Sequence, residues 1–228
     1  MNKQFFLLQV NDALFPIGGY SHSYGLETYI QKGIVHDTDS ARDYLFHKLK
    51  DNLLYNDLFA VRLSYEYVAK GQIDQLIELN QLTEAGKVPA ELRDASLKMG
   101  SRFLKTIQGL NIPFEIDFLS AFVNAAGNKK IHHACLYGAF CASVGIEQAD
   151  ALSHYLYAQT SAIVTTCVKS IPLSQTDGQK ILVSSFPLLS EMLEEVTRLP
   201  IRLYGCSAPA FDIRSMQHEA LYSRIYMS

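Results

Sequence analysis

The chain has 228 residues, of which 48% are hydrophobic and 19% are charged. This composition is typical of a folded globular protein with a sizeable core, and it argues against extensive disorder. The 20 Lys and Arg residues against 23 Asp and Glu residues leave a formal charge of −3. No basic stripe is interleaved with aromatic residues, so we do not expect nucleic acid to be a partner.

The apolar stretches of the sequence are too short to span a lipid bilayer, so we expect no membrane association. Near the N-terminus, the apolar run Phe5–Leu8 is interrupted too soon to form the core of a signal peptide. The four cysteines are widely spaced and form no CxxC pair, which favours buried thiols over a disulfide framework. We therefore expect a soluble, cytoplasmic protein.

Apolar residues recur at helical spacing along nearly the whole chain, and glycine and proline separate the helical stretches. Alternating β-branched runs are rare, and a helical pattern follows the one Asp-Gly dipeptide. In chain order, the predicted helices cover residues 21–32, 40–70, 73–85, 89–107, 114–126, 130–144, 147–169, 174–199 (kinked or divided by Pro187) and 209–226. The sequence thus predicts one all-α domain over residues 1–228, a bundle of about nine or ten helices. Within it, residues 209–228 form a C-terminal tail that can be flexible.

Two capping-box patterns mark the beginnings of predicted helices. They are Ser40-Ala-Arg-Asp43 and Ser174-Gln-Thr-Asp177. In such a box the serine hydroxyl accepts a hydrogen bond from a backbone N–H of the first helical turn. We therefore expect Ser40 and Ser174 to be N-cap residues.

The densest motif of the chain is Pro16-Ile-Gly-Gly-Tyr-Ser-His-Ser-Tyr-Gly-Leu-Glu27. It is not a phosphate-binding loop, because Gly25 is followed by leucine rather than by lysine. Nor is it a nucleophile elbow, which needs glycine two residues on either side of the serine. Its chemistry favours a tight turn in which glycines permit unusual backbone angles and Ser21 caps a helix. The alternative is a small helical hydrolase that uses Ser21, His22 and Glu27.

Histidine spacing predicts no metal site. The adjacent His132 and His133 would point about 100° apart on a helix and cannot easily share one ion. No two histidines are spaced four apart on one helical face, and Met216, His218 and Glu219 would need ligands from elsewhere. The amphipathic stretch that contains them is either a last helix docked on the core or a partner-binding tail.

Six segments of the chain form a recognisable series. In chain order they are the Pro16–Glu27 segment, Met99-Gly-Ser-Arg-Phe-Leu104, His133-Ala-Cys-Leu-Tyr-Gly138, Pro172-Leu-Ser-Gln-Thr-Asp-Gly-Gln179 with Lys169 before it, Ser215-Met-Gln-His-Glu219 and Ser223-Arg-Ile-Tyr-Met-Ser228. These motifs, in this order, resemble those of the urease accessory protein UreF family. One departure is Ser174, which stands where many members carry glycine.

The resemblance implies an all-helical, homodimeric accessory protein without catalytic residues, enzymatic activity or a cofactor of its own. Family members bind the accessory protein UreD, also called UreH, and together they recruit the GTPase UreG. The assembly delivers nickel to apo-urease, so nickel and GTP are handled by the partner proteins. The UreF component is expected to coordinate GTP hydrolysis with nickel transfer.

Three groups of residues are the candidates for the partner-binding surface. They are Tyr20, His22, Ser23 and Glu27 in the N-terminal motif; His218, Glu219, Tyr222 and Arg224 in the tail; and Lys169, Gln175 and Asp177 at the corner between two helices. Lys169 is also favoured by the dipole at the end of its helix, whatever its function.

We further expect the C-terminal tail to fold against the turn formed by the N-terminal motif. Arg224 would then donate hydrogen bonds to the Tyr20 hydroxyl or to nearby carbonyls.

Overall fold

The computed structural model describes residues 2–228, and within that range the chain is helical and contains no β-strand, as predicted. Short 3₁₀ turns, η1 and η3, and a π-helical segment, η2, supplement the α-helices. In chain order the elements are α1 (Lys3–Val10), η1 (Gly19–Ser21), α2 (Leu26–Gln31), α3 (Thr38–Lys48), η2 (Leu49–Leu58), α4 (Phe59–Ala69), α5 (Ile73–Gly86), α6 (Ala90–Gln108), α7 (Phe118–Ala126), α8 (His133–Val144), α9 (Gln148–Ser170), α10 (Gln175–Arg198), η3 (Ile201–Leu203) and α11 (Pro209–His218).

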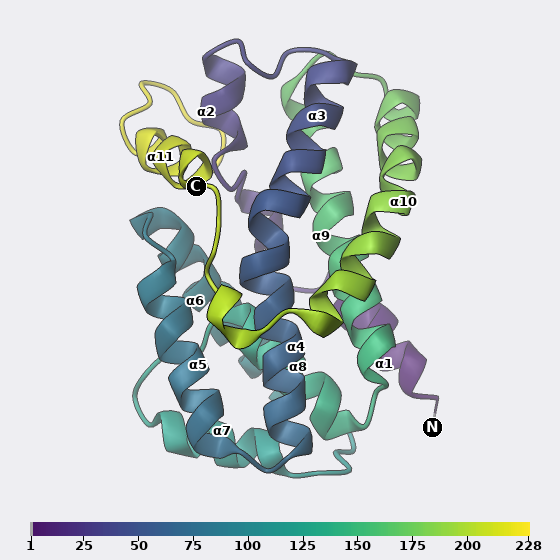
Figure 1. Cartoon of the computed structure of the whole chain (residues 1–228), viewed down its shortest axis with the longest axis vertical. Helices are drawn as coiled ribbons and strands as arrows, with labels where there is room; N and C mark the ends of the chain where they lie inside the picture. The colour runs from purple at the N-terminus through teal and green to yellow at the C-terminus, as the bar shows by residue number, and fades with distance from the viewer. Residues whose placement is uncertain (1) are drawn as a thin grey trace.

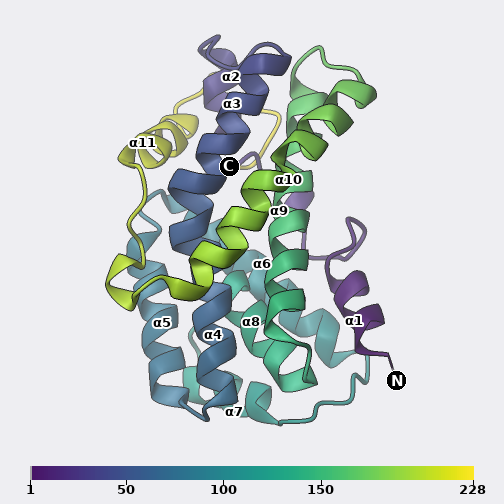
Figure 2. The same ribbon diagram turned by 45° about the vertical axis from the view of Figure 1, so that its right-hand side comes forward.

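A long rod formed by α3, η2 and α4 runs through the middle of the molecule (Figure 1). Helix α8 packs along α4, and all twelve of its residues are buried, which makes it the centre of the core. Helices α9 and α10 lie side by side along one flank of the rod (Figure 2), and α5 and α6 lie on the other. Helices α2 and α11 pack together at one end of the bundle, beside the C-terminus. None of the described helices is long and apolar enough to cross a lipid bilayer.

Two glycines allow the central helices to approach each other closely. At Gly138 in α8, an added Cβ would collide with the carbonyl oxygen of Val61 in α4. At Gly100 in α6, it would collide with the carbonyl oxygen of Ile131, just before α8. Because backbone atoms cannot move aside as a flexible side chain can, these contacts require glycine.

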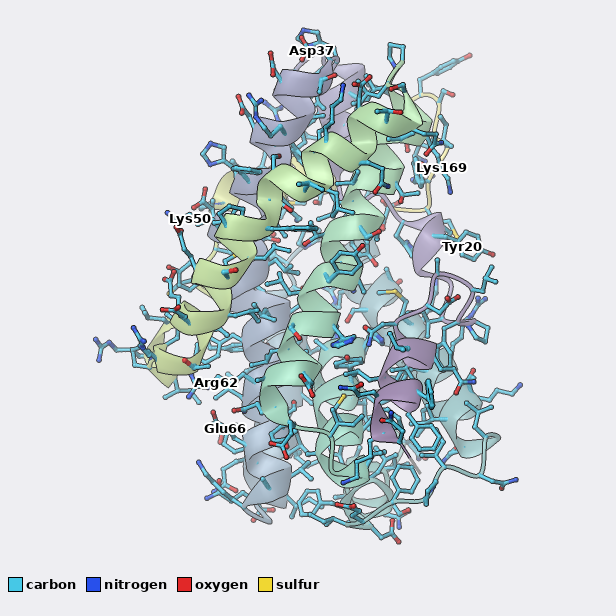
Figure 3. All side chains as sticks on the ribbon, turned by 90° about the vertical axis from the view of Figure 1, so that its right-hand side faces the viewer. Tyr20, Asp37, Lys50, Arg62, Glu66 and Lys169 are labelled. Carbon is cyan, nitrogen blue, oxygen red and sulfur yellow. The ribbon has the colours of Figure 1, made fainter. Side chains whose placement is uncertain are left out.

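Helix α10 continues through Pro187 as one helix, so the proline does not divide it. Proline lacks the N–H that would bond to the preceding turn, but α10 packs along α9 and also contacts α3 and η2. The carbonyls at the end of α10 are also satisfied, because Arg62 of α4 donates to Val196 (2.9 Å) and Leu199 (2.7 Å). The Nε atom of Arg62 also donates to the Glu66 carboxylate, at an Nε–Oε1 distance of 2.6 Å. Figure 3 shows the two side chains together beside the end of α10.

Several predicted helix boundaries are wrong at their beginnings. The helix predicted from residue 114 begins at Phe118, because the N–H groups of Glu115 and Ile116 donate to the Ser143 carbonyl instead. The helix predicted from residue 130 begins at His133. The helix predicted from residue 40 begins earlier, at Thr38. Its N-cap is Asp37, and Ser40 completes that capping box from inside the first turn, whereas Ser174 is the N-cap of α10 as predicted.

The two ends of the chain differ most from the prediction. Helix α1 was not predicted, and the helix predicted over 21–32 is reduced to α2, because Tyr24 and Gly25 have positive φ and interrupt it. The helix predicted over 209–226 ends at His218, and the last ten residues form a non-helical tail. The prediction of buried thiols holds for three of the four free cysteines, whereas Cys206, in the loop after η3, is exposed.

The close contact between α4 and α8 can be tested with Gly138→Ala. Because the new methyl group would meet a backbone carbonyl, we expect the free energy of unfolding to fall by about 1–3 kcal/mol. The control is Gly86→Ala at the end of α5, where an added Cβ meets nothing within 4 Å. That variant should be neutral or slightly stabilised. Urea denaturation of both variants measures the difference, and equal stabilities would contradict this account of the packing.

Candidate functional site

The segment between α1 and α2, here called the N-terminal turn (residues 16–25), changes direction through three left-handed residues. Gly18 has φ of +81°, Tyr24 of +54° and Gly25 of +86°. At Gly25 an added Cβ would also lie 2.5 Å from the Ser215 hydroxyl on α11. Glycine is therefore required there both by the backbone angle and by the close approach of α11.

The C-terminal tail (residues 219–228) runs back along the N-terminal turn and bonds to its backbone. The Met227 N–H donates to the Ser21 carbonyl at 2.8 Å. The carbonyl oxygen of Ser228 accepts hydrogen bonds from the N–H groups of Ser23 (2.7 Å) and Tyr24 (3.1 Å), and from the Ser23 hydroxyl (2.7 Å). The predicted folding of the tail against the N-terminal turn is therefore confirmed.

A buried carboxylate, Glu27 in the first turn of α2, anchors the tail. It is 4% exposed, and it accepts hydrogen bonds from the backbone N–H groups of Ile225 (2.7 Å) and Tyr226 (3.1 Å). The Nε2 atom of His218 lies 3.1 Å from the same carboxylate. These donors compensate for removing the charge of Glu27 from water, which would otherwise be very unfavourable.

The imidazole of His218 links two carboxylates. Its Nδ1 lies 2.6 Å from Glu91 on α6, and its Nε2 faces Glu27. Both ring nitrogens therefore lie within hydrogen-bond distance of a carboxylate oxygen. Glu91 in turn accepts a hydrogen bond from Arg224 of the tail at 2.6 Å. We call these four side chains, Glu27, His218, Glu91 and Arg224, the tail latch.

The four side chains of the tail latch form one connected chain of contacts. Two carboxylates alternate with an imidazole and a guanidinium, and His218 itself is completely buried. Removing Glu27 or His218 would leave a buried polar group without its partner, which costs far more than an exposed ion pair contributes. The tail is therefore held by interactions that act together.

His22 sits under the end of the tail. It is buried, and its Nδ1 lies 2.9 Å from the Ser228 hydroxyl. Burial, together with the positive charges of Lys98 and Arg102 on α6, lowers the pKa of His22. The ring is therefore neutral near pH 7, and it contributes a hydrogen bond to the tail rather than a charge.

The tail and the N-terminal turn expose four large apolar or aromatic side chains. Along the tail, the exposed side chains of Ile225 (78%) and Met227 (59%) alternate with the buried Tyr226 and Ser228. Tyr222 is fully exposed, and Tyr20 of the N-terminal turn is 77% exposed. Clusters of exposed large apolar side chains are typical of surfaces that bind other proteins. We call the four exposed side chains, Tyr20, Tyr222, Ile225 and Met227, the apolar face.

Comparison with known proteins identifies the family. The UreF family profile matches residues 35–185. The chain is 34% identical over 230 residues to the urease accessory protein UreF of Bacillus sp. (strain TB-90), with all of both chains covered. It is 36% identical to UreF of Actinobacillus pleuropneumoniae serotype 5b, with 97% of each chain covered. It is 35% identical to UreF of Haemophilus influenzae (strain Rd), with 97% of this chain and 94% of the relative covered. The chain belongs to the UreF family.

Membership of the UreF family supports a role in urease maturation. The relatives' names describe accessory proteins, in agreement with the expectation that the chain is not an enzyme. The geometry likewise gives no support to a hydrolase built on Ser21, His22 and Glu27. The Ser21 hydroxyl donates to the Gly18 carbonyl at 2.8 Å, while His22 and Glu27 bind the tail. Within residues 2–228, no three His, Cys, Asp or Glu side chains are arranged to hold a metal ion.

The structure separates the predicted partner-binding residues of this UreF protein into buried and exposed sets. His22, Ser23, Glu27 and His218 are buried and bind other parts of the same chain. The exposed set, which a partner could reach directly, is Tyr20, Glu219, Tyr222 and Arg224.

The third predicted group lies at the corner between α9 and α10. Lys169 and Gln175 are exposed, whereas Asp177 is half-buried and bonds to Ser174 (2.6 Å) and Lys180 (3.2 Å). Figure 3 shows Lys169 and Tyr20 on the same side of the molecule. The tail reaches this corner, because the Tyr226 hydroxyl accepts a hydrogen bond from Ser170, at the end of α9.

One predicted contact is wrong. Arg224 was expected to donate to the Tyr20 hydroxyl or to nearby carbonyls, but it donates to Glu91. Glu91 was not among the predicted residues, because it lies on α6, far along the chain from both Arg224 and His218. Its position in the first turn of a predicted helix has an ordinary explanation in the helix dipole, so no local signal distinguished it.

The role of the tail latch can be tested with Glu27→Ala. Because the substitution removes the acceptor of two backbone N–H groups and leaves the buried His218 ring with only Glu91 as a partner, we expect the tail to detach. Breaking a buried ion pair by removing one partner costs about 3–5 kcal/mol. Hydrogen exchange at the amides of Ile225 and Tyr226 measures the effect, and it should become at least about tenfold faster.

The matched control is Glu219→Ala, which removes an exposed carboxylate from the same tail. It should leave the exchange of both amides unchanged. Equal exchange in the wild type and in Glu27→Ala would show that Glu27 does not anchor the tail.

Proposed function

We propose that this chain is a non-catalytic adaptor of urease maturation that binds UreD (UreH) and recruits and regulates the GTPase UreG. In this role it promotes nickel delivery to apo-urease. Membership of the UreF family supports the maturation role, and the structural feature that supports an adaptor is the apolar face. That face leaves large apolar side chains in water on a segment that the tail latch holds in place.

The tail latch makes this surface suited to binding. A free tail would lose conformational entropy on binding a partner, and that loss would weaken the complex. Here the hydrogen bonds from Ile225 and Tyr226 to Glu27 already order the tail. The two remaining members of the exposed set, Glu219 and Arg224, add charged groups to the same tail, and charged groups in an interface favour specificity and rapid association.

We expect the protein to act as a homodimer in the cytoplasm, without a cofactor of its own, while the partner proteins handle nickel and GTP. The corner of Lys169, Gln175 and Asp177 adjoins the tail through the Tyr226 hydroxyl. It is therefore a second candidate contact for the same partners.

The first experiment is a pull-down with purified UreD (UreH) at physiological salt, followed by addition of UreG with GTP and magnesium. We expect a stable complex that retains UreG only when this chain is present. Size-exclusion chromatography with light scattering on the same samples would give the stoichiometry and test for the dimer. No binding by the folded protein would refute the proposal.

The apolar face itself is tested with Tyr222→Ala. Because this side chain is fully exposed, its removal should leave the stability unchanged but lower the affinity for UreD (UreH) or UreG by at least about tenfold. The control is Ile201→Ala in η3, which removes an exposed apolar side chain that belongs neither to the tail nor to the N-terminal turn and should bind as the wild type does. Unchanged affinity in Tyr222→Ala would exclude Tyr222 from the interface.

A further inference from the structure

The outward side of α6 carries three cations at successive helical turns. Lys98, Arg102 and Lys105 are exposed and are spaced four and three residues apart, so they lie on one side of the helix. Among residues 2–228, no carboxylate forms an ion pair with any of the three, and none of their side chains donates a hydrogen bond. We call these three residues the basic face of α6.

Local helical preferences do not explain this arrangement. The helix dipole favours a cation in the last turn of a helix, which accounts for Lys105 but not for Lys98 in the middle of α6. Like charges three or four residues apart repel one another, and a carboxylate at the same spacing would offset this repulsion. Other helices of this protein contain such pairs, which are Arg42–Asp39 in α3 (3.1 Å) and, in α10, Lys180–Asp177 (3.2 Å) and Arg198–Glu194 (3.8 Å).

The carboxylates on the same side of α6 do not neutralise the basic face. Glu91 is one of them, but it already binds His218 and Arg224 in the tail latch. Asp94, one turn before Lys98, is exposed and forms no ion pair within the described chain. Three cations therefore stand against one free carboxylate, and this side of α6 keeps an excess of positive charge that is open to solvent.

One end of the basic face lies beside the N-terminal turn and the end of the tail. A Cβ added at Gly18 would come within 2.7 Å of Nη1 of Arg102, so this guanidinium lies against the turn. Burial and the positive charges of Lys98 and Arg102 lower the pKa of His22, whose ring binds the end of the tail. The basic face thus adjoins both segments that carry the apolar face.

The other end of the basic face meets a second exposed apolar surface. Lys105 is followed by Thr106, which lines a groove together with residues of α1 and of the loop after it. Leu14 (90% exposed) and Leu8 (54%) both line this groove, and Leu110 closes it beyond the end of α6. Apolar side chains bordered by charged groups are typical of protein–protein interfaces, which have an apolar centre and a polar rim.

We propose that the basic face of α6 binds carboxylates on the surface of a partner protein, while the apolar face takes apolar side chains of the same partner. The inference rests on the proposed function, since it names the chemistry that UreD (UreH) or UreG would present to this side of the molecule. Opposite charges around an apolar contact steer the partner and raise the association rate constant. Nucleic acid fits less well, because three cations neutralise few phosphates and the whole chain carries a net charge of −3.

The proposal is tested with the double variant Lys98→Glu/Arg102→Glu of the full chain. Surface plasmon resonance measures its association with purified UreD (UreH) and with UreG at ionic strengths of about 0.05 M and 0.5 M. At the lower ionic strength we expect the association rate constant for at least one partner to fall at least about tenfold, because attraction becomes repulsion. Salt screens exposed charges, so the difference from the wild type should shrink at the higher ionic strength.

The matched control is Lys50→Glu/Arg202→Glu, which makes the same change in net charge at two exposed positions outside α6, the tail and the N-terminal turn. Figure 3 shows Lys50 and Tyr20 at opposite edges of the molecule. The control should associate as fast as the wild type does. The neutral variant Lys98→Gln/Arg102→Gln should show a smaller loss, and it provides the same test if the two glutamates lower the melting temperature.

The outcomes separate this inference from the proposed function. If neither partner binds the wild type, the proposed function fails and the inference fails with it. If a partner binds but associates equally fast with the wild type and with the α6 variants, only the inference is overturned. An equal loss in the control variant would mean an effect of net charge and would also overturn it. So would tighter binding of duplex DNA or of phosphatidylserine vesicles than of either protein, because the basic face would then serve another class of partner.

Discussion

The buried carboxylate of Glu27 holds together the end of the bundle where α2, α11 and the C-terminal tail meet. It is buried between α2 and the tail, and its oxygens receive two backbone N–H groups and the imidazole of His218. A charged group in this position is stable only while all of its donors are present. Glu27 therefore fixes the tail as a whole, and through Glu91 it connects α2 and the tail to α6.

The same constraint explains why the two ends of the chain form one surface. The last residues could have continued α11, but the N–H groups of Ile225 and Tyr226 bond to Glu27 rather than to a preceding helical turn. An extended tail presents alternate residues on opposite sides. Tyr226 consequently faces inward while Ile225 and Met227 remain in water. A helix over the same residues would have distributed these side chains differently, so the hydrogen bonding of Glu27 also determines the apolar face.

Helix α11 links the tail latch to the central rod. At its C-terminal end, His218 belongs to the tail latch, and in its first turn the ring of Phe211 lies 4.9 Å from the ammonium of Lys48. Its middle lies against the N-terminal turn at Gly25. The rest of the bundle, in which α8 packs against α4 around Gly138, is a fixed support for this helix.

The sequence by itself determined the all-α fold, most of the helices from residue 73 to residue 199 and the family to which the chain belongs. It could do so because helical periodicity, glycine and proline breaks and capping serines act within a few residues along the chain. It also placed His22, Glu27 and His218 among the important residues, through their motifs. Only the tertiary structure decided that Glu27 contacts His218, that His22 contacts the end of the tail, that the tail is extended and that Glu91 joins His218 to Arg224. Those features arise from contacts between segments far apart in the sequence, where the burial of a charge, and not local helical preference, selects the conformation.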